Sequence, residues 1–341
     1  MARLLLALCL LWLTGCGGPE LTRRESHVFG TRVEISVWGP AEAVAAPHIE
    51  AVLADFDRLQ RKLHPWQPSE LTRLNRAFAA SSPAAIDLEL RELLVEARAY
   101  EALSDGLFSP AIGEVVRLWG FHDDQFVARL PDPVALAAEV AAQPRLADLD
   151  VGETAVSSRN PAVKLDLGGF AKGWALDRAA SYLRRHRIDN ALINIGGNVL
   201  AMGRKGDQPW RVGLQHPRAA GAIASLSLND GEAIGTSGDY QRYFELDGRR
   251  YHHLIDPRNG RPAPGIQAAT VLAPKGPRAG TVSDVATKPL FIGGLNGARA
   301  MAERFGVAAM LVTADGSVYL DRAMQARLTW LIKPAHVYTL R

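Results

Sequence analysis

The order of its two periodicities constrains the fold of this chain more than any other sequence feature. Residues 27–37 alternate, with three β-branched residues on one face, and this pattern predicts a strand. Residues 49–63 then place apolar side chains three and four positions apart, which predicts an amphipathic helix that ends before Pro65. Strands and helices continue to mix without a steady strand–helix–strand alternation. We therefore predict an α+β fold, with mixed sheets and helices.

The rest of the chain carries further strand, cap and turn signals. Strands are expected at 191–195, 211–215, 223–228, 232–236 and 268–272, and a hairpin turning at 247–248 joins 242–246 to 249–254. Helices are expected after the N-cap Ser69, over 90–100 with a stop at 104–106, near 134–142, from Gly168-Gly169 onward, and over 279–305 with a break near 293–294. A final hairpin turns at 315–316.

Composition limits the classes of protein to which the chain can belong. Of the 341 residues, 48% are hydrophobic and 22% are charged, which is typical of a globular protein and excludes a disordered chain or a multi-span membrane protein. The length suits one large domain or two subdomains in close contact. The formal net charge of only +3 argues against nucleic acid as a partner. With only Cys9 and Cys16, no disulfide framework or cysteine-rich zinc site is possible.

The first sixteen residues have the pattern of an export signal. Arg3 precedes an apolar run over 4–13, and residues 13–16 read Leu-Thr-Gly-Cys, which resembles a bacterial lipobox. We predict a signal peptide over 1–15, lipidation of Cys16, a polar tether over 16–26 and a folded domain over 27–341. The protein would then lie in the bacterial periplasm, attached to a membrane, with the inner membrane favoured. An ordinary signal peptide with a chance cysteine is the alternative.

Three segments carry candidate chemistry. In the first, Asp166 precedes Gly168-Gly169 at a helix start, where free N–H groups favour a phosphate, and Lys172 follows. A tight turn explains the glycines equally well. In the second, His253 and Asp256 flank a buried pair, so that an imidazole could act as a general base beside a carboxylate. The alternative is a surface or core histidine.

The third segment is an oxygen-rich stretch near residue 285. Asp284 and Thr287 lie three apart and would share a helix face, and a carboxylate with a hydroxyl is a set of hard oxygen ligands suited to Mg²⁺. A helix N-cap formed by Ser283 or Asp284 is the alternative.

Taken together and in this order, these segments resemble the ApbE family, the FAD:protein FMN transferases. The matching stretches are 29–31, 66–71, 105–113, 118–121, 166–173, 194–198, 237–240, 253–260 and 284–287. The resemblance covers most of residues 27–315. It implies two intimate subdomains with an FAD cleft between them, and Mg²⁺ as cofactor.

The resemblance also implies roles for single residues. The positions matched to FAD contacts are Phe29, Trp66, Leu107, Phe108, Ser109, Asp166, Lys172 and Leu254. Those matched to the metal are Gly169, Asp284 and Thr287, and those assigned to catalysis are His253 with Asp256 in support. Two departures stand out. Ser109 replaces a carboxylate of the family, and the family's Asp commonly stands four residues before its Thr, whereas Asp284 stands three before Thr287.

The implied reaction joins FMN, taken from FAD, to a Thr or Ser hydroxyl and releases AMP. The acceptor would be an exported segment of a membrane electron-transfer flavoprotein. Three alternatives remain open at this point: a Mg²⁺-dependent FAD pyrophosphatase, in which water replaces the hydroxyl; a flavin-binding lipoprotein without catalysis; and a solute-binding lipoprotein without flavin.

Overall fold

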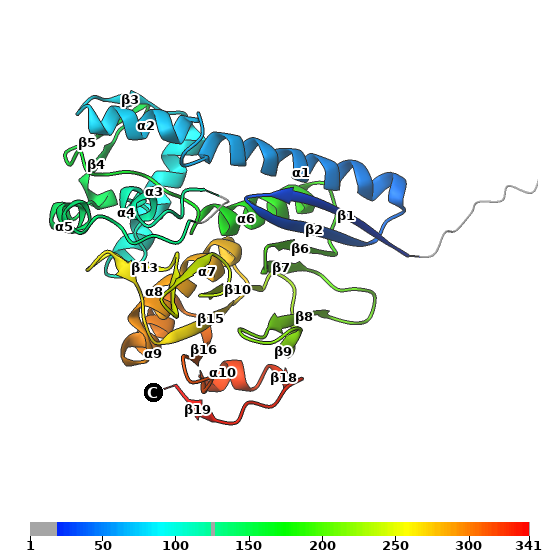
Figure 1. The fold of residues 1–341 in the computed structure, drawn as a ribbon. Coiled ribbons are helices and arrows are strands. Elements are labelled where there is room, and N and C mark those ends of the chain that lie inside the picture. Colours follow the sequence, from blue (N-terminus) through cyan, green and yellow to red (C-terminus); the bar gives the residue numbers. More distant parts are fainter. Residues whose placement is uncertain (1–18, 124–126, 341) are drawn as a thin grey trace, which may run out of the picture.

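A nine-stranded sheet runs through the part of the chain that the structure describes, which is residues 19–123 and 127–340 of a computed structural model (Figure 1). Neighbouring strands are antiparallel except for the last pair, β17 and β19. In spatial order the strands are β1 (Glu20–Val28), β2 (Thr31–Gly39), β6 (Ala191–Ile195), β7 (Asn198–Met202), β10 (Ala233–Gly238), β15 (Ile266–Ala273), β16 (Ala308–Thr313), β17 (Val318–Leu320) and β19 (Val337–Thr339).

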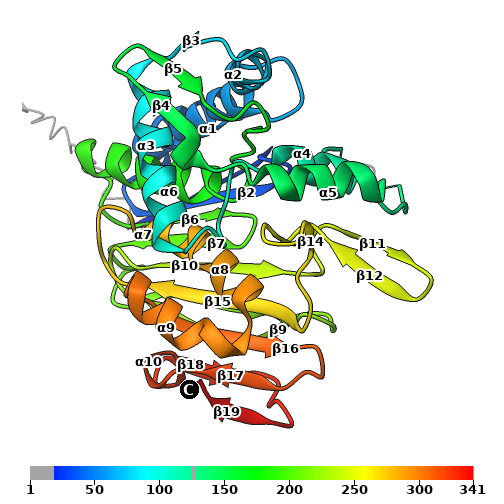
Figure 2. The same cartoon turned by 90° about the vertical axis from the view of Figure 1, so that its left-hand side faces the viewer.

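Helices cover one face of this sheet. They are α1 (Glu42–Leu63), α6 (Ala171–Arg185), α7 (Ala279–Val285), α8 (Thr287–Gly293) and α9 (Leu295–Phe305). Beyond them lie α2 (Glu70–Ala79), α3 (Leu88–Leu103), the short helix η1 (Leu146–Asp148) and a small sheet of β3 (Ala84–Ala85), β5 (Ala155–Ser158) and β4 (Leu149–Val151) (Figure 2). One continuous core includes Ile35 of β2, Phe56 of α1, Leu93 of α3 and Phe291 of α8. The part built on the nine-stranded sheet and the part that contains α2, α3 and the small sheet therefore share one core, as expected for intimate subdomains.

The opposite face is covered by a second sheet of β18 (Leu328–Trp330), β9 (Ala222–Leu228) and β8 (Trp210–Gln215), with α10 (Arg322–Gln325) beside it. Strand alternation assigns the side chains to the two faces. In β16, Ala309 and Leu311 belong to the core under the helices, whereas Met310 and Val312 belong to the core under the second sheet.

A hairpin of β11 (Tyr243–Leu246) and β12 (Arg249–His252) projects from the sheet and packs on α4 (Gly113–Leu118) and α5 (Pro133–Ala142) (Figure 2). Phe244 of the hairpin shares a small apolar cluster with Trp119, Phe121 and Leu136. The chain then passes through β13 (Ile255–Asp256) and β14 (Arg261–Pro262) before it re-enters the sheet. This small cluster therefore links the hairpin to the helices α4 and α5.

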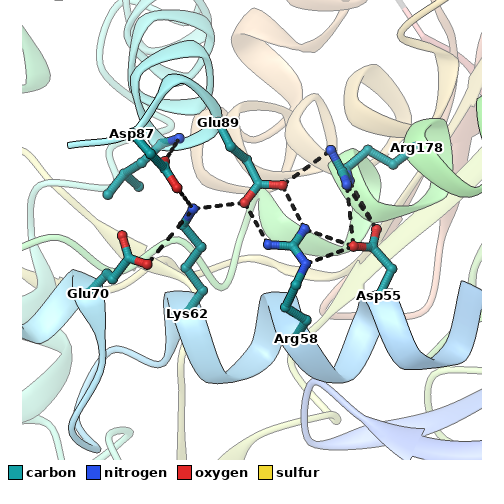
Figure 3. A network of polar contacts seen from close by, with 8 residues as sticks. Asp55, Arg58, Lys62, Glu70, Asp87, Glu89 and Arg178 are labelled. Atoms are coloured by element: carbon teal, nitrogen blue, oxygen red, sulfur yellow. Dashed lines mark hydrogen bonds and ion pairs between the residues drawn. The ribbon is translucent and has the colours of Figure 1, made fainter. Parts of the chain in front are cut away.

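A network of ion pairs joins α1 to α3 and α6 (Figure 3). Arg58 of α1 contacts Glu89 at 2.6 Å, and Arg178 of α6 reaches both Glu89 and Asp55. Lys62, with only 8% of its side chain exposed, also contacts Glu89, at 2.9 Å. Burial alone would raise the pKa of Glu89, but the hydrogen bonds from Arg58 and Lys62 lower it to about 2. The carboxylate therefore stays ionised and ties the three helices together.

Most elements predicted from the sequence are confirmed within one or two residues, including the Ser69 cap, which accepts from Thr72 N at 3.0 Å. The strand expected over 27–37 is instead divided by the turn at Phe29-Gly30, and the helix expected over 49–63 begins earlier, at Glu42. The tether is the main correction. Residues 20–26 form most of β1, which pairs with β2 along its whole length. The strand is rich in charged residues and buries few side chains, as edge strands often do, so its sequence lacks the apolar alternation that predicts a strand.

Three further differences lie in the second half of the chain. Strand β12 ends at His252 instead of 254, the helical stretch 279–305 has a further boundary at Ala286, and α10, β18 and β19 follow the hairpin at 315–316 that was expected to be the last element. The predicted signal peptide and Cys16 lie outside the described residues. In the described ranges, no helix has both the length and the apolar composition needed to cross a membrane.

Candidate functional site

The glycine turn before α6 is where the predicted phosphate-binding residues meet. Asp166 accepts a hydrogen bond from Gly168 N at 2.9 Å, and the Lys172 ammonium donates to Gly168 O at 3.1 Å. Gly168 and Gly169 lead directly into α6, as predicted. The carboxylate thus holds the turn from inside, while the lysine closes it at the first turn of the helix.

Helices α6 and α7 touch at a point where no side chain fits between them. A Cβ on Gly173 would lie 2.5 Å from Gly280 O and 2.7 Å from the Asp284 Cβ, which is too close for any real contact. The Gly173 N–H instead donates to Asp284 Oδ2 at 2.9 Å. This close approach brings the Gly168-Gly169 turn and Asp284, more than a hundred residues apart in sequence, into one site.

Asp177 fixes the start of α7 and was not singled out in the sequence. Its carboxylate accepts from Gly280 N at 2.7 Å, from Thr281 N at 2.8 Å and from Thr281 Oγ1 at 2.6 Å. Burial raises its pKa to about 6. The sequence did contain a signal that could have identified Asp177. It is an acidic residue three positions after Trp174, so it lies on the apolar face of the predicted helix.

The carboxylate of Asp284 is buried, and each of its oxygens accepts a hydrogen bond. It is 1% exposed; Oδ2 accepts from Gly173 N, and Oδ1 is paired with the ammonium of Lys288, which also donates to Asp284 O at 2.8 Å. Burial would raise the pKa of Asp284, but the charges of Lys288 and Lys172 lower it. The residue is therefore an anion that two lysines compensate.

The Thr287 hydroxyl makes two hydrogen bonds. It donates to Asp284 O at 2.6 Å and bonds to Ser237 Oγ of β10 at 2.7 Å. Mg²⁺ demands several oxygens in near-octahedral order. Since the ammonium of Lys288 already sits on the Asp284 carboxylate, and the Thr287 hydroxyl is turned to Ser237 and to the Asp284 carbonyl, the predicted Mg²⁺ ligands fit Lys288 instead of Mg²⁺. Among the described residues, no group of three His, Cys, Asp or Glu side chains could hold a metal.

Lys288 extends over Gly169, the third predicted metal position. A Cβ on Gly169 would lie 3.2 Å from the Lys288 Cε and 3.7 Å from the Phe108 ring. Burial lowers the pKa of Lys288 to about 8, against the attraction of Asp284. The charge of Lys172 also acts on Asp284, Lys288 and His253. These four groups therefore form a single electrostatic cluster beside the glycine turn.

The two neighbouring histidines have different environments. His252 is buried; its Nε2 donates to Ala263 O at 3.0 Å, and its Nδ1 accepts from Leu254 N at 3.3 Å. His253 is half-buried, and its Nδ1 lies 3.2 Å from Arg242 O. A carbonyl oxygen can only accept, so Nδ1 of His253 carries the proton and Nε2 is left as an acceptor. This arrangement favours His253 as the residue that can contact a substrate.

Asp256 does not contact His253. Its carboxylate binds Arg258 at 2.7 Å and Asn259 at 3.4 Å, and its carbonyl closes a turn with Gly260 N at 2.8 Å. The predicted support of His253 by Asp256 is therefore corrected. Asp256 holds the loop whose Gly260 O accepts from the Trp119 indole at 2.6 Å.

The predicted aromatic contacts of FAD lie at two separate places. Trp66 stands edge-on to His64, and the guanidinium of Arg242 lies 5.7 Å from the Trp66 ring centre. Because Arg242 also supports His253, the structure links Trp66 to that histidine. Phe29 occupies the left-handed turn between β1 and β2, with φ at 57°, and packs on Phe56 of α1. No contact in the described part of the chain joins Phe29 to Trp66.

Of the remaining predicted FAD contacts, Phe108 and Leu254 are buried, and Leu107 and Ser109 are half-buried. Phe108 packs against Phe170 at the base of the glycine turn, and Leu107 lies against Gly293. The Ser109 hydroxyl donates to the buried carboxylate of Glu101 at 2.6 Å. Ser109 stands where the family resemblance expects a carboxylate, so Glu101 supplies a carboxylate next to that position. Leu254 is a core residue whose carbonyl accepts from Ala263 N at 2.9 Å.

A cavity of about 650 Å³ lies beside the glycine turn. Trp66 and Asp166 line it, together with polar groups that include Asn75, Arg117 and Lys164. This size lies in the range of small-molecule and cofactor sites. Asp166 borders both the cavity and the turn that carries Lys172, so a ligand could occupy the cavity with an anionic group at the lysines.

The burial of His252 predicts that the stability of the protein depends on pH. Burial lowers its folded pKa to about 4, below the unfolded value near 6.5, so the unfolded chain binds the proton more readily. Stability is therefore complete above pH 6.5 and falls as the pH drops toward 4, by about 3 kcal/mol. In urea unfolding at pH 7 and 4.5, the wild type should lose that much more stability than His252→Gln. Equal losses would contradict the assignment.

With this geometry established, the chain can be compared with known proteins. A model of the ApbE family matches residues 29–311. The chain belongs to the ApbE family. It is 40% identical over 303 residues to an FAD:protein FMN transferase of Rhodobacter capsulatus, covering 89% of this chain and 57% of that protein. A second one, from Klebsiella pneumoniae, is 34% identical over 268 residues, covering 76% and 80%. The chain thus spans little more than half of the Rhodobacter protein.

Structures of ApbE proteins confirm the α+β fold. The ApbE protein of Thermotoga maritima superposes with a TM-score of 0.81 at 29% identity, covering 90% of this chain and 99% of that one. Every predicted site residue except Cys16 lies within the range matched by the ApbE model, beginning with Phe29 itself. The family is therefore shown for the same stretch that carries the glycine turn, the lysines and the histidines.

Proposed function

We propose that this protein transfers FMN from FAD to a Thr or Ser hydroxyl of an acceptor protein and releases AMP. The observation that carries the proposal is the cluster of Lys172, Lys288 and His253 beside the Gly168-Gly169 turn. Two ammonium groups can bind the negatively charged oxygens of a diphosphate. An imidazole with an acceptor nitrogen can accept a hydrogen bond from the hydroxyl of the acceptor protein. The relatives named FAD:protein FMN transferases support the same reaction.

The reaction is an exchange of one P–O bond for another. The acceptor oxygen attacks the phosphorus that carries riboflavin, a new O–P bond forms, and the bond from that phosphorus to the bridging oxygen breaks. AMP leaves with the bridging oxygen and its electron pair, and the hydroxyl proton is released. The charge that develops on AMP is the part that most needs a nearby cation.

His253 can position the attacking hydroxyl. With Nδ1–H held by Arg242 O, Nε2 can accept a hydrogen bond from the acceptor O–H. Burial, and after it the charge of Arg242, lowers the pKa of His253 to about 3, so the ring is neutral at physiological pH and ready to accept. At this pKa, orientation of the hydroxyl is the larger part of its role, and full removal of the proton the smaller.

The family resemblance also predicts Mg²⁺ as a cofactor. The residues present favour an ammonium over this ion, since Lys288 is paired with the Asp284 carboxylate where the ion was expected, and the Thr287 hydroxyl is turned to Ser237 and to Asp284 O. A requirement for Mg²⁺ is the competing hypothesis, and the experiments of the next section separate the two.

The place of action is part of the same proposal. Cys16, with the preceding apolar run, would attach the protein to a membrane on the periplasmic side, where the acceptor would be an exported segment of a membrane electron-transfer flavoprotein. Fractionation of cells expressing the wild type and Cys16→Ala tests the anchor. The wild type should sediment with membranes and the variant should be found in the soluble periplasmic fraction.

The transfer itself is tested by mass spectrometry. A Thr-bearing acceptor protein incubated with the enzyme and FAD should gain the mass of FMN less one water, with one AMP released for each modified acceptor. AMP release without a modified acceptor would identify a pyrophosphatase instead. Tight FAD binding without AMP would identify a flavin carrier, and a protein that binds no flavin would contradict the proposal altogether.

Trp66→Ala should weaken FAD binding before it slows transfer. Stacking on an aromatic ring contributes roughly 0.5–1.5 kcal/mol beyond buried area, so the affinity should fall by about 3- to 10-fold or more. Flavin fluorescence quenching measures it. Trp330→Ala, on the far sheet, is the matched control and should leave the affinity unchanged. The same affinity in both variants would place the flavin ring elsewhere.

A further inference from the structure

We propose that the Lys288 ammonium takes the place of the predicted Mg²⁺ and binds the diphosphate of FAD directly. This inference rests on the proposed function and concerns how that site compensates negative charge. Lys288 stands four residues after Asp284, on the next turn of the α7–α8 segment, so both side chains point the same way. Four residues is also the Asp-to-Thr spacing expected for the metal ligands from the family resemblance.

The carboxylate of Asp284 holds the ammonium in position. The carboxylate is 1% exposed and takes one further hydrogen bond, from Gly173 N at 2.9 Å. Lys288 itself is 14% exposed and donates a second bond to Asp284 O at 2.8 Å. An ammonium has three donors, so one N–H remains for a ligand on its solvent side. Asp284 thus binds the ammonium of Lys288, whereas it was expected to bind the metal ion.

A metal ion on the Asp284 carboxylate would lie beside the ammonium of Lys288. The stem of Lys288 crosses Gly169, with 3.2 Å between its Cε and the position of a Cβ there, and Phe108 lies on the other side. Mg²⁺ on Asp284 would be repelled by Lys288 and by Lys172, whose charge acts on the same carboxylate. Two ammonium groups lie beside this buried carboxylate, and both can donate to the oxygens of a diphosphate.

The wild type alone gives the first test. After treatment with a chelator, it should bind FAD with an affinity within about twofold of that measured in Mg²⁺, and it should still transfer FMN. Calorimetric titration of Mg²⁺ into the FAD-free protein should show no saturable binding. Loss of both FAD binding and transfer in chelator, with recovery on adding Mg²⁺, would overturn the proposal.

Two variants give the second test. Lys288→Met should weaken FAD binding about 10-fold or more and slow transfer by roughly 10²–10³-fold at any Mg²⁺ concentration, since it removes a charge aimed at the leaving group. Lys275→Met removes an exposed lysine that pairs with Asp230 and should change neither. Lys288→Thr puts an oxygen four residues after Asp284, and we expect it to gain saturable Mg²⁺ binding and Mg²⁺-dependent transfer.

The outcomes separate this inference from the proposed function. Transfer that requires Mg²⁺ in the wild type, or a Lys288→Met variant that folds and works normally, overturns the role of Lys288 while the transferase remains. If no acceptor is modified under any condition, the proposed function fails, and the FAD affinities of Lys288→Met and Lys275→Met still decide whether Lys288 binds the diphosphate. If Lys288→Met does not fold, judged by thermal unfolding, the chelator test decides.

Discussion

His253→Ala is expected to slow the transfer of FMN by about 10²–10⁴-fold at saturating FAD. Its Nδ1–H is fixed by Arg242 O at 3.2 Å, so Nε2 is the nitrogen that can receive the acceptor hydroxyl. The affinity for FAD should change little, because the contacts assigned to the diphosphate come from the lysines on α6 and α8. The rate is measured as the mass gained by a Thr-bearing acceptor.

Two comparisons show what His253 does. His253→Gln keeps an oxygen acceptor near the position of Nε2, so it should recover part of the rate if the histidine orients the hydroxyl, and none if it removes the proton outright. His27→Ala changes an exposed histidine on the edge strand and should transfer normally. A normal rate for His253→Ala would remove histidine from the mechanism and leave the cations alone.

The neighbouring histidine is a measure of stability, not a silent control. Because adjacent side chains in a strand point to opposite faces, the hairpin expected over 249–254 predicts that His252 faces away from His253 and that His252→Ala has almost no effect. In the structure the other face is the core, where both ring nitrogens of His252 are bonded and the ring stands edge-on to Phe291. We therefore expect His252→Ala to lower stability while a folded sample keeps its transfer rate.

Gly173→Ala should destabilise the protein by about 3 kcal/mol or more and abolish transfer. Its Cβ would overlap Gly280 O, the Asp284 Cβ and the Thr281 Cα, and two of these atoms belong to the backbone, so α6 and α7 would have to separate. Overpacking of this kind costs about 1–3 kcal/mol, and more where backbone must move. The separation would also break the 2.9 Å bond from Gly173 N to Asp284. Urea unfolding and FAD binding measure the two effects.

Gly297→Ala provides the matched control. Gly297 also lies within a helix, α9, but it is exposed and no atom lies within 4 Å of the position of its Cβ. Because alanine favours the helix over glycine, this substitution should stabilise the protein by about 0.5–1 kcal/mol. Equal effects of the two substitutions would mean that the α6–α7 contact is not as close as the structure shows.

The local elements of this fold could be read from the sequence because their causes are local. The helix predicted over 49–63 has its apolar spacing, Ser69 has its cap, and the Asp247-Gly248 turn has the residues that a tight hairpin prefers. Strand β1 could not, since an edge strand that buries only two of its nine side chains has no clear alternation to detect. Its partner β2 supplies the hydrogen bonds that define it.

The sequence by itself determined the family, the α+β class and most of the residues that gather at the site. Tertiary structure decided their roles. Asp256 turned out to bind Arg258 in its own loop. Asp284 turned out to hold Lys288, the residue that stands at the four-residue spacing where the family resemblance places a Thr. Sequence spacing shows which side chains share a helix face, but only the close contact of α6 and α7 shows which charge each buried carboxylate meets. The physical reason is that a buried charge is compensated by whichever group packing brings to it, and packing joins residues more than a hundred positions apart.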